Sequence, residues 1–436
     1  MKTNKGSVSQ FIGSCAALLP RAWAVLILAV AVAVEAGGVT LKVDRIKQRY
    51  PWNGLVDIDY TIQWGAGESP DRNDRLEVLM VDNSVQPAVT NRAARFLQTP
   101  VPMTDGPHRI TWDANCDGVT NRVAAAEFHV KIVRYSEAYM LIDVSNGADD
   151  DKTYPVTFMD HEPEGGFNQD LYKSSVIVLR RIHPGSYIAG SPSDEASREG
   201  GANGIVEKQH PVSISRPFYI GIFEVTQRQY YNVMGSVPTG MTWGDYYPVG
   251  KVFNTAIRGG NWPDDPSIGS DTFIGKLISK CRKEDPRTHQ FTEPMTGFDL
   301  PTEFQWEYAC RAGTTGAIST TNEFDNTNAE GQLAELVKMG QVGTTAFAKV
   351  GSFEPNPWGL YDMYGNAWEC CLDWFVKDVV ALKQYVDPVG PETGLQRVSR
   401  GGSATNGIGD CRSGKRNSSS GADNRFGFRL CCTMAR

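Results

Sequence analysis

The stretch that most constrains the fold runs from Pro355 to Phe375 and reads PNPWGLYDMYGNAWECCLDWF. Its 21 positions hold three Trp, two Tyr, two Gly and three acidic residues, and neither a helical nor a strand period accounts for that mixture. Four oxygen-bearing positions follow one another at intervals of two or three residues: Asp362, Gly365, Ala367 and Glu369.

These four positions are spaced too closely to share one face of a helix, so they converge only where the backbone loops. Carboxylates and backbone carbonyls around a tight glycine turn are typical ligands of a hard cation such as calcium. The alternative is an aromatic-rich loop that fills a core and leaves its acidic side chains in water.

The same stretch resembles the signature of the formylglycine-generating enzyme family (sulfatase-modifying factor domain), whose usual form is GLYDMxGNVWEW. Further blocks resemble the family in the family's order: FYIGIFEVTQRQYYNVMG at 218–235, LPTEFQWEYACRAG at 300–313, RGGS at 400–403, CRSGKR at 411–416 and GFRL at 427–430. The resemblance covers residues 172–436. It implies an α+β domain with a variant C-type-lectin-like fold, short sheets and two helices.

The N-terminus predicts export. Lys2, Lys5 and Arg21 precede the apolar run 22–34, and small residues stand before Gly37. This is the layout of a signal peptide over residues 1–36, and the run is short for a membrane span, which needs about 20 residues. A retained anchor is the alternative. We expect an extracytoplasmic protein, secreted or periplasmic, with no membrane association after cleavage.

Residues 37–135 predict a β-sandwich of the immunoglobulin or fibronectin kind. Short alternating segments recur between turn signals, at 39–43, 55–62, 76–81, 108–112 and 128–133. The loop from Trp112 to Gly118 has the composition of a calcium loop, although a plain turn is the simpler interpretation.

Polar, turn-rich residues 136–171 predict a connector, and residues 172–436 form the family-like domain. Within it we expect a strand at 176–182 and amphipathic helices at 227–234 and 302–311. Thr302 is a good N-cap residue ahead of Glu303.

The resemblance also implies calcium ligands. In the family, the positions equivalent to Asp362 and Glu369 bind through their side chains, and those equivalent to Gly365 and Ala367 bind through their carbonyls. A second family site uses an asparagine between the central helix and the signature, and Asn328 is the best match for it.

Nine cysteines are present, and eight remain after the predicted cleavage. An even number in an exported chain favours disulfides. The resemblance implies a Cys310–Cys411 bond, which closes a loop of about 100 residues and stabilises by roughly 4–5 kcal/mol in the chain-entropy model. It similarly implies a bond between Cys281 and either Cys431 or Cys432.

The family's oxidase activity needs two cysteines, three and eight positions after the serine of RGGS, to bind copper(I). Here that serine is Ser403, the third successor is Asn406, and the eighth is Cys411. Anchoring on CRSGKR instead makes Cys411 a structural cysteine. Either alignment leaves the thiolate pair incomplete, so copper is expected only if the protein is catalytic. The candidate catalytic residues are Cys411, Ser403 and Trp368, of which the last two flank the family's substrate groove.

Two function classes follow. One is a calcium-stabilised binding module that recognises a peptide or glycan, and the other is an oxidoreductase that converts a sulfatase cysteine to formylglycine. The missing thiolate favours the first. The net charge of −7 and the lack of a basic block argue against nucleic acid as a partner.

Overall fold

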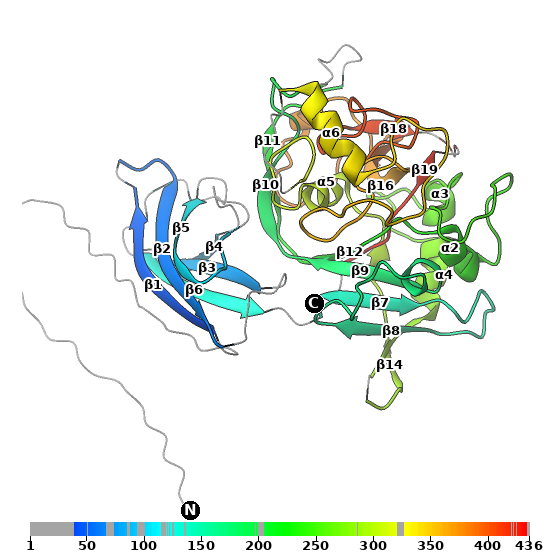
Figure 1. Cartoon of the computed structure of the whole chain (residues 1–436), viewed down its shortest axis with the longest axis horizontal. Coiled ribbons are helices and arrows are strands. Elements are labelled where there is room, and N and C mark those ends of the chain that lie inside the picture. Colours follow the sequence, from blue (N-terminus) through cyan, green and yellow to red (C-terminus); the bar gives the residue numbers. More distant parts are fainter. Residues whose placement is uncertain are drawn as a thin grey trace, which may run out of the picture.

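The computed structural model describes most of the chain from Val39 onward (Figure 1). The described residues are 39–49, 51–66, 74–84, 88–93, 101–114, 119, 121, 123, 126–134, 137–196, 198, 205–285, 287–320, 327–419, 421, 423 and 425–433. The predicted signal peptide and the centre of the 112–118 loop lie outside them.

Two three-stranded antiparallel sheets form the N-terminal unit, drawn in blue and cyan in Figure 1. One sheet has the order β1 (Val39–Gln48), β2 (Leu55–Trp64), β5 (Gly106–Asp113), and the other β4 (Val89–Arg92), β3 (Asp74–Asp82), β6 (Ala126–Arg134). All five predicted segments lie within these strands. Alternate residues of β1, β2, β3, β5 and β6 pack into a shared core that includes Trp112 and Tyr60. The immunoglobulin-like or fibronectin-like topology stays a prediction.

The larger unit is built on an eight-stranded sheet. Its order is β14 (Phe291–Pro294), β13 (Cys281–Glu284), β8 (Tyr154–Met159), β7 (Tyr139–Asp143), β9 (Val176–Ile182), β12 (Phe218–Gly221), β20 (Cys431–Cys432) and β15 (Phe298–Asp299). Only the pairing of β8 with β13 is parallel among these strands.

Residues 136–171, predicted as a connector, instead hold β7 and β8 of this sheet. Met140 and Ile142 of β7 and Tyr154 and Val156 of β8 are completely buried in the core. The strands are short and separated by polar turn residues, so their sequence signal is weak. Their stability comes from pairing with β9 and β13, which lie far along the chain.

The remaining strands of the larger unit form two smaller sheets. A hairpin pairs β10 (Gly185–Ala189) with β11 (His210–Ile214), and four strands follow the order β18 (Asn417–Ser419), β17 (Arg397–Arg400), β16 (Trp368–Trp374), β19 (Phe426–Gly427). The second sheet carries the signature stretch in β16.

The two predicted long helices are confirmed. Helix α2 (Gln227–Met234) begins at a capping box formed by Thr226 and Gln229, and helix α5 (Glu303–Arg311) begins at one formed by Thr302 and Gln305. The remaining helices of the described chain are α1 (Leu171–Ser174), α3 (Asn254–Ile257), α4 (Phe273–Lys280), α6 (Ala329–Met339) and the 3-10 turn η1 (Val380–Leu382). None of the described helices is long and apolar enough to cross a membrane.

A buried network of charged side chains joins helix α5 to the C-terminal blocks. Arg400 of β17 lies 3.2 Å from Glu303 and 2.9 Å from Glu307. Arg416 donates to both oxygens of Glu303 at 2.7 and 2.9 Å, and Arg311 pairs with Glu307 at 2.7 Å. Although burial alone would raise the pKa values of the two glutamates, the arginines outweigh it and hold both below the ordinary value.

Removing one partner of this network should destabilise the larger unit strongly. In Arg400→Met, Glu303 and Glu307 each lose a buried charge partner, so we expect about 3–5 kcal/mol less stability in urea unfolding. The control is Lys152→Met, which breaks an exposed pair with Asp151 and should cost less than about 1 kcal/mol. Equal, small losses in both variants would contradict a structural role for the network.

Candidate functional site

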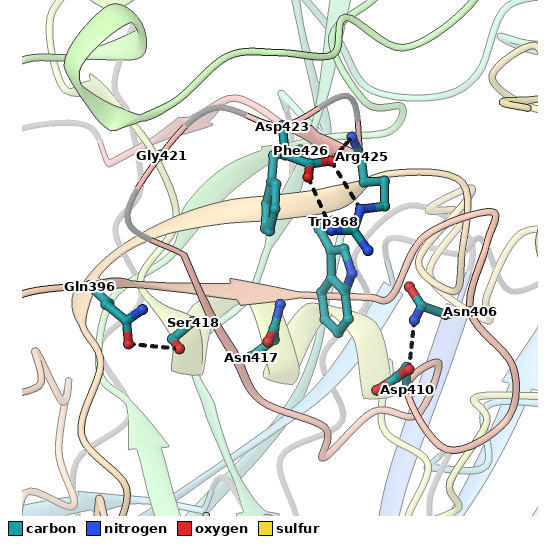
Figure 2. Close-up of a pocket in the computed structure, with 10 residues that line it drawn as sticks. All are labelled: Trp368, Gln396, Asn406, Asp410, Asn417, Ser418, Gly421, Asp423, Arg425 and Phe426. Carbon is teal, nitrogen blue, oxygen red and sulfur yellow. Dashed lines mark hydrogen bonds and ion pairs between the residues drawn. The ribbon is translucent and has the colours of Figure 1, made fainter. Parts of the chain in front are cut away.

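A polar surface pocket of about 520 Å³ opens over the four-stranded sheet, with lining residues from β16, β18 and β19. Figure 2 shows its lining residues: Trp368, Gln396, Asn406, Asp410, Asn417, Ser418, Gly421, Asp423, Arg425 and Phe426. Its volume lies within the range of small-molecule sites. The sequence pointed only to Trp368 and Asn406 here, because the other residues come from segments without a diagnostic motif.

The inner wall of the pocket is aromatic. Trp368 opens β16 and is paired in parallel with Phe426 of β19, and its backbone N–H donates to the carbonyl of Arg425 at 2.8 Å. Both rings are almost completely buried, and Figure 2 shows the Trp368 indole at the centre of the pocket. The sheet therefore holds the wall in place.

Polar pairs form the rim. Arg425 donates to both carboxylate oxygens of Asp423 at 2.9 and 3.0 Å. The Ser418 hydroxyl donates to Oε1 of Gln396 at 3.1 Å. These pairs are exposed, so a ligand can reach their remaining hydrogen-bonding atoms.

Asn406 is fixed within its loop. Its Oδ1 accepts from the backbone N–H of Ser403 at 3.0 Å and from the Ser403 hydroxyl at 2.6 Å. Its Nδ2 donates to Asp410 at 2.6 Å, and Lys415 lies 3.2 Å from the same carboxylate. Both ends of the Asn406 amide are thus engaged, and Ser403 is buried as its partner.

Cys411 is buried and is not among the residues that line the pocket. Its sulfur packs so closely on Gly402 that a Cβ there would come within 2.3 Å of it. Burial, followed by the charge of Asp410, raises the pKa of Cys411 well above its ordinary value, against the weaker opposing effect of nearby backbone amides. A buried, protonated thiol is a poor nucleophile and a poor ligand for a soft metal.

The predicted disulfides are not formed, because all seven described cysteines are free thiols: Cys281, Cys310, Cys370, Cys371, Cys411, Cys431 and Cys432. Cys310 lies 3.9 Å from the Ser413 hydroxyl, two residues beyond its predicted partner Cys411. Burial raises its pKa to about 12. The thiols expected to pair with Cys281 contact other groups, since Cys431 lies 4.0 Å from Gln305 and Cys432 donates to the carbonyl of Thr296 at 3.6 Å.

The candidate calcium turn lies in the interior beside β16. Asp362, Gly365 and Asn366 have positive φ angles of 56°, 81° and 56°, which produce the sharp turn that the sequence predicted. Asp362 is buried, and its Oδ2 accepts from the backbone N–H of Gly351 at 2.7 Å. Its Oδ1 is buried and has no hydrogen-bond partner among the described residues.

Three residues that the sequence analysis did not single out complete this cluster: Arg429, Trp306 and Glu224. Arg429 binds both oxygens of Glu369 at 2.5 and 2.6 Å, and the Trp306 indole N–H donates to the same carboxylate at 2.6 Å. Glu224 accepts from the side chain of Asn366 at 2.6 Å and lies near Asp362 and Glu369. The GFRL block contains Arg429 and the 218–235 block contains Glu224, but spacing alone does not bring them together.

The cluster carries more negative than positive charge. Three buried carboxylates, Glu224, Asp362 and Glu369, share one buried arginine, Arg429. Burial, reinforced by the neighbouring carboxylates, raises the pKa of Glu224 well above its ordinary value. Burial also raises the pKa of Asp362, to about 6. Burial is the main cause of both shifts, so both carboxyl groups favour their protonated form in the folded protein, although Arg429 and Lys173 lower the pKa of Asp362.

The residues fit a cation in part. Asp362 offers a free, buried oxygen, whereas both oxygens of Glu369 are already taken by Arg429 and Trp306. Within the described ranges, no three His, Cys, Asp or Glu side chains gather in a metal-binding arrangement. Asn328 is exposed, and its Oδ1 caps helix α6 by accepting from the N–H of Glu330 at 2.9 Å. It does not join the Asp362 turn.

Comparison with known proteins agrees with the motifs. The sulfatase-modifying factor enzyme 1-like domain family matches residues 173–434. The formylglycine-generating enzyme of Thermomonospora curvata is 39% identical over 116 residues, which are 24% of this chain and 38% of that protein. The enzyme of Streptomyces coelicolor is 34% identical over 160 residues, which are 34% of this chain and 48% of that protein.

The chain thus spans less than half the length of these two relatives. Among solved structures, Treponema denticola variable protein 1 is 26% identical with a TM-score of 0.44, over 59% of this chain and 96% of its own. Because the family match covers more than half of the 436 residues, the chain belongs to the formylglycine-generating enzyme (sulfatase-modifying factor enzyme 1-like) family.

Proposed function

We propose that this protein is an extracytoplasmic binding module of its family, stabilised by calcium, and that its ligand occupies the pocket of Figure 2. The single observation that carries the proposal is Asn406. The amide occupies the first thiolate position, and its bonds to Ser403 and Asp410 make it part of the pocket wall. A peptide or a glycan is the proposed ligand class.

Oxidation of a sulfatase cysteine is the second candidate. Ser403 and Trp368 are retained, and Cys411 stands eight positions after Ser403, which favours it. Copper(I) would be the activating metal, but it prefers a pair of thiolates. Asn406 cannot supply one, and the Cys411 thiol is buried with a raised pKa. The binding function therefore has the stronger support.

The extracytoplasmic location rests on residues 1–36 alone, through their basic start, short apolar run and small residues before Gly37. Seven free buried thiols are compatible with that location, since burial protects them from oxidants.

Calcium at the Asp362 turn would supply structural charge compensation. Asp362 would bind it through Oδ1, and the carbonyls of Gly365 and Ala367 would complete the protein ligands nearby. Glu369 would contribute as a neighbouring negative charge while Arg429 holds it. The free oxygen of Asp362 and the charge excess of the cluster support this proposal.

Calcium should raise the stability of the larger unit. A ligand that binds only the folded state, present at about 100 times its dissociation constant, adds roughly 2.7 kcal/mol. We expect a difference of that size between calcium and chelator in urea unfolding, and its loss in Asp362→Ala. Asp150→Ala, which changes an exposed carboxylate, is the control. A calcium effect that survives Asp362→Ala would show that the ion binds elsewhere.

The pH dependence of stability in chelator should report on Asp362. Its pKa is raised from an ordinary value of 3.8 to about 6 in the folded protein, so folding favours the protonated form. The resulting stability is present in full below pH 3.8 and is lost as pH rises through 6. Wild type should therefore lose about 1 kcal/mol more than Asp362→Asn between about pH 5 and pH 7.5.

Comparing the two proteins removes the titration of Asp373, whose pKa burial raises to about 8, because it occurs in both. The difference includes the response of Glu224, because the charge of Asp362 helps to raise the pKa of Glu224. Parallel stability curves for wild type and Asp362→Asn would show that the Asp362 carboxyl does not titrate in this range.

The protein should not produce formylglycine. We expect no aldehyde when a cysteine-containing sulfatase peptide is incubated with the protein, copper(I), reductant and oxygen, as followed by mass spectrometry. Aldehyde formation that Cys411→Ser abolishes, and that the matched thiol control Cys370→Ser retains, would establish the oxidoreductase function instead.

A further inference from the structure

The lining of the pocket narrows the chemistry of its ligand. The pocket presents three carboxamides (Gln396, Asn406 and Asn417), two carboxylates, a serine hydroxyl and one arginine. The large apolar side chains among its lining residues, Trp368 and Phe426, are almost completely buried. A ligand here gains its affinity from hydrogen bonds, with little apolar surface to cover.

The charges of the pocket are already compensated. Asp423 is paired with Arg425, and Asp410 is paired with Lys415 behind the wall. An anionic ligand would meet two carboxylates and would compete for an arginine that is engaged, while a cationic ligand would compete with that arginine and Lys415. The electrostatics therefore favour an uncharged ligand.

The side chains of Gln396 and Asn417 leave both a hydrogen-bond donor and a hydrogen-bond acceptor for a ligand. The Gln396 Oε1 accepts from Ser418, and the Asn417 Nδ2 donates to Ser399 at 3.3 Å. Among bonds within the described chain, this leaves Nε2 of Gln396 as a donor and Oδ1 of Asn417 as an acceptor. Figure 2 shows Gln396 beside Ser418, and Asn417 between Ser418 and the Trp368 indole. A hydroxyl group both donates and accepts, so vicinal hydroxyls match such a lining.

We infer that the pocket binds a neutral saccharide, with Gln396 and Asn417 hydrogen-bonded to its hydroxyl groups. The inference rests on the proposed function, since it names the ligand class of the same pocket. A volume of about 520 Å³ accommodates a short segment of one to a few sugar units. Free oligosaccharides and units of a polysaccharide both satisfy the inference, because their hydroxyl chemistry is the same.

The test uses the full purified chain with three sets of probes. These are neutral oligosaccharides in solution and as an immobilised polysaccharide, acidic oligosaccharides that carry sulfate or uronate groups, and cysteine-containing peptides. We expect binding to the neutral sugars. Comparing binding to the soluble oligosaccharides with binding to the immobilised polysaccharide shows which of the two forms the protein recognises.

Gln396→Ala and Asn417→Ala should each weaken neutral-sugar binding about tenfold, as expected for one lost hydrogen bond. The matched control is Gln290→Ala, an exposed glutamine on the β13–β14 hairpin, which should bind as wild type does. Melting curves of all variants, expected to coincide, separate lost contacts from lost folding.

Three other results are possible, and each has a different consequence for the inference and for the proposed function. Neutral-sugar binding that survives both pocket variants would overturn the inference by placing the sugar elsewhere. Binding of peptides or acidic sugars only, weakened by the same two variants, would overturn it and leave the proposed binding function intact. If no probe of any class binds, both the inference and the proposed function fail.

Discussion

The buried contact between helix α5 and the C-terminal blocks is the interaction on which the rest of this structure depends. Glu303 and Glu307 stand one turn apart on the helix, and Arg400 and Arg416 reach them from segments about 100 residues away. Charges in a core are tolerated only when fully paired. The network therefore fixes where β17 and the CRSGKR segment lie, and with them one side of the pocket.

Strand β16 links this frame to the second buried cluster. Neighbouring residues of a strand point to opposite faces. Trp368 accordingly lines the pocket, while Glu369 points inward to Arg429 and Trp306. The buried cluster around Asp362 therefore includes a residue, Glu369, that directly follows Trp368 of the pocket wall. A cation that relieves the charge excess of this cluster would stabilise the strand from which the pocket is built.

The loop that borders the pocket is held in place by its own side chains. The loop from Ser403 to Cys411 keeps its position through hydrogen bonds from Ser403 to Asn406 and from Asn406 to Asp410. The Asn406 amide can do this because it accepts through Oδ1 and donates through Nδ2, and it adds polar surface to the pocket. Redox chemistry, in contrast, depends on the sulfur itself. Under the proposed function, an amide in place of one thiolate would leave this loop ordered without the sulfur pair that copper(I) prefers.

The sequence by itself determined the elements with strong local signals. Helices α2 and α5 were predicted from their amphipathic patterns, with Thr302 as the N-cap residue of α5, and β9 was predicted from its apolar run. The turn at Asp362 was predicted from the close spacing of its oxygen-bearing positions around a glycine. Tertiary structure alone decided which distant groups meet. It placed β7 and β8 in the main sheet, positioned Ser413 rather than Cys411 beside Cys310, and paired Glu369 with Arg429. These outcomes depend on packing between segments separated by tens to hundreds of residues, and such contacts leave no periodic trace in the chain.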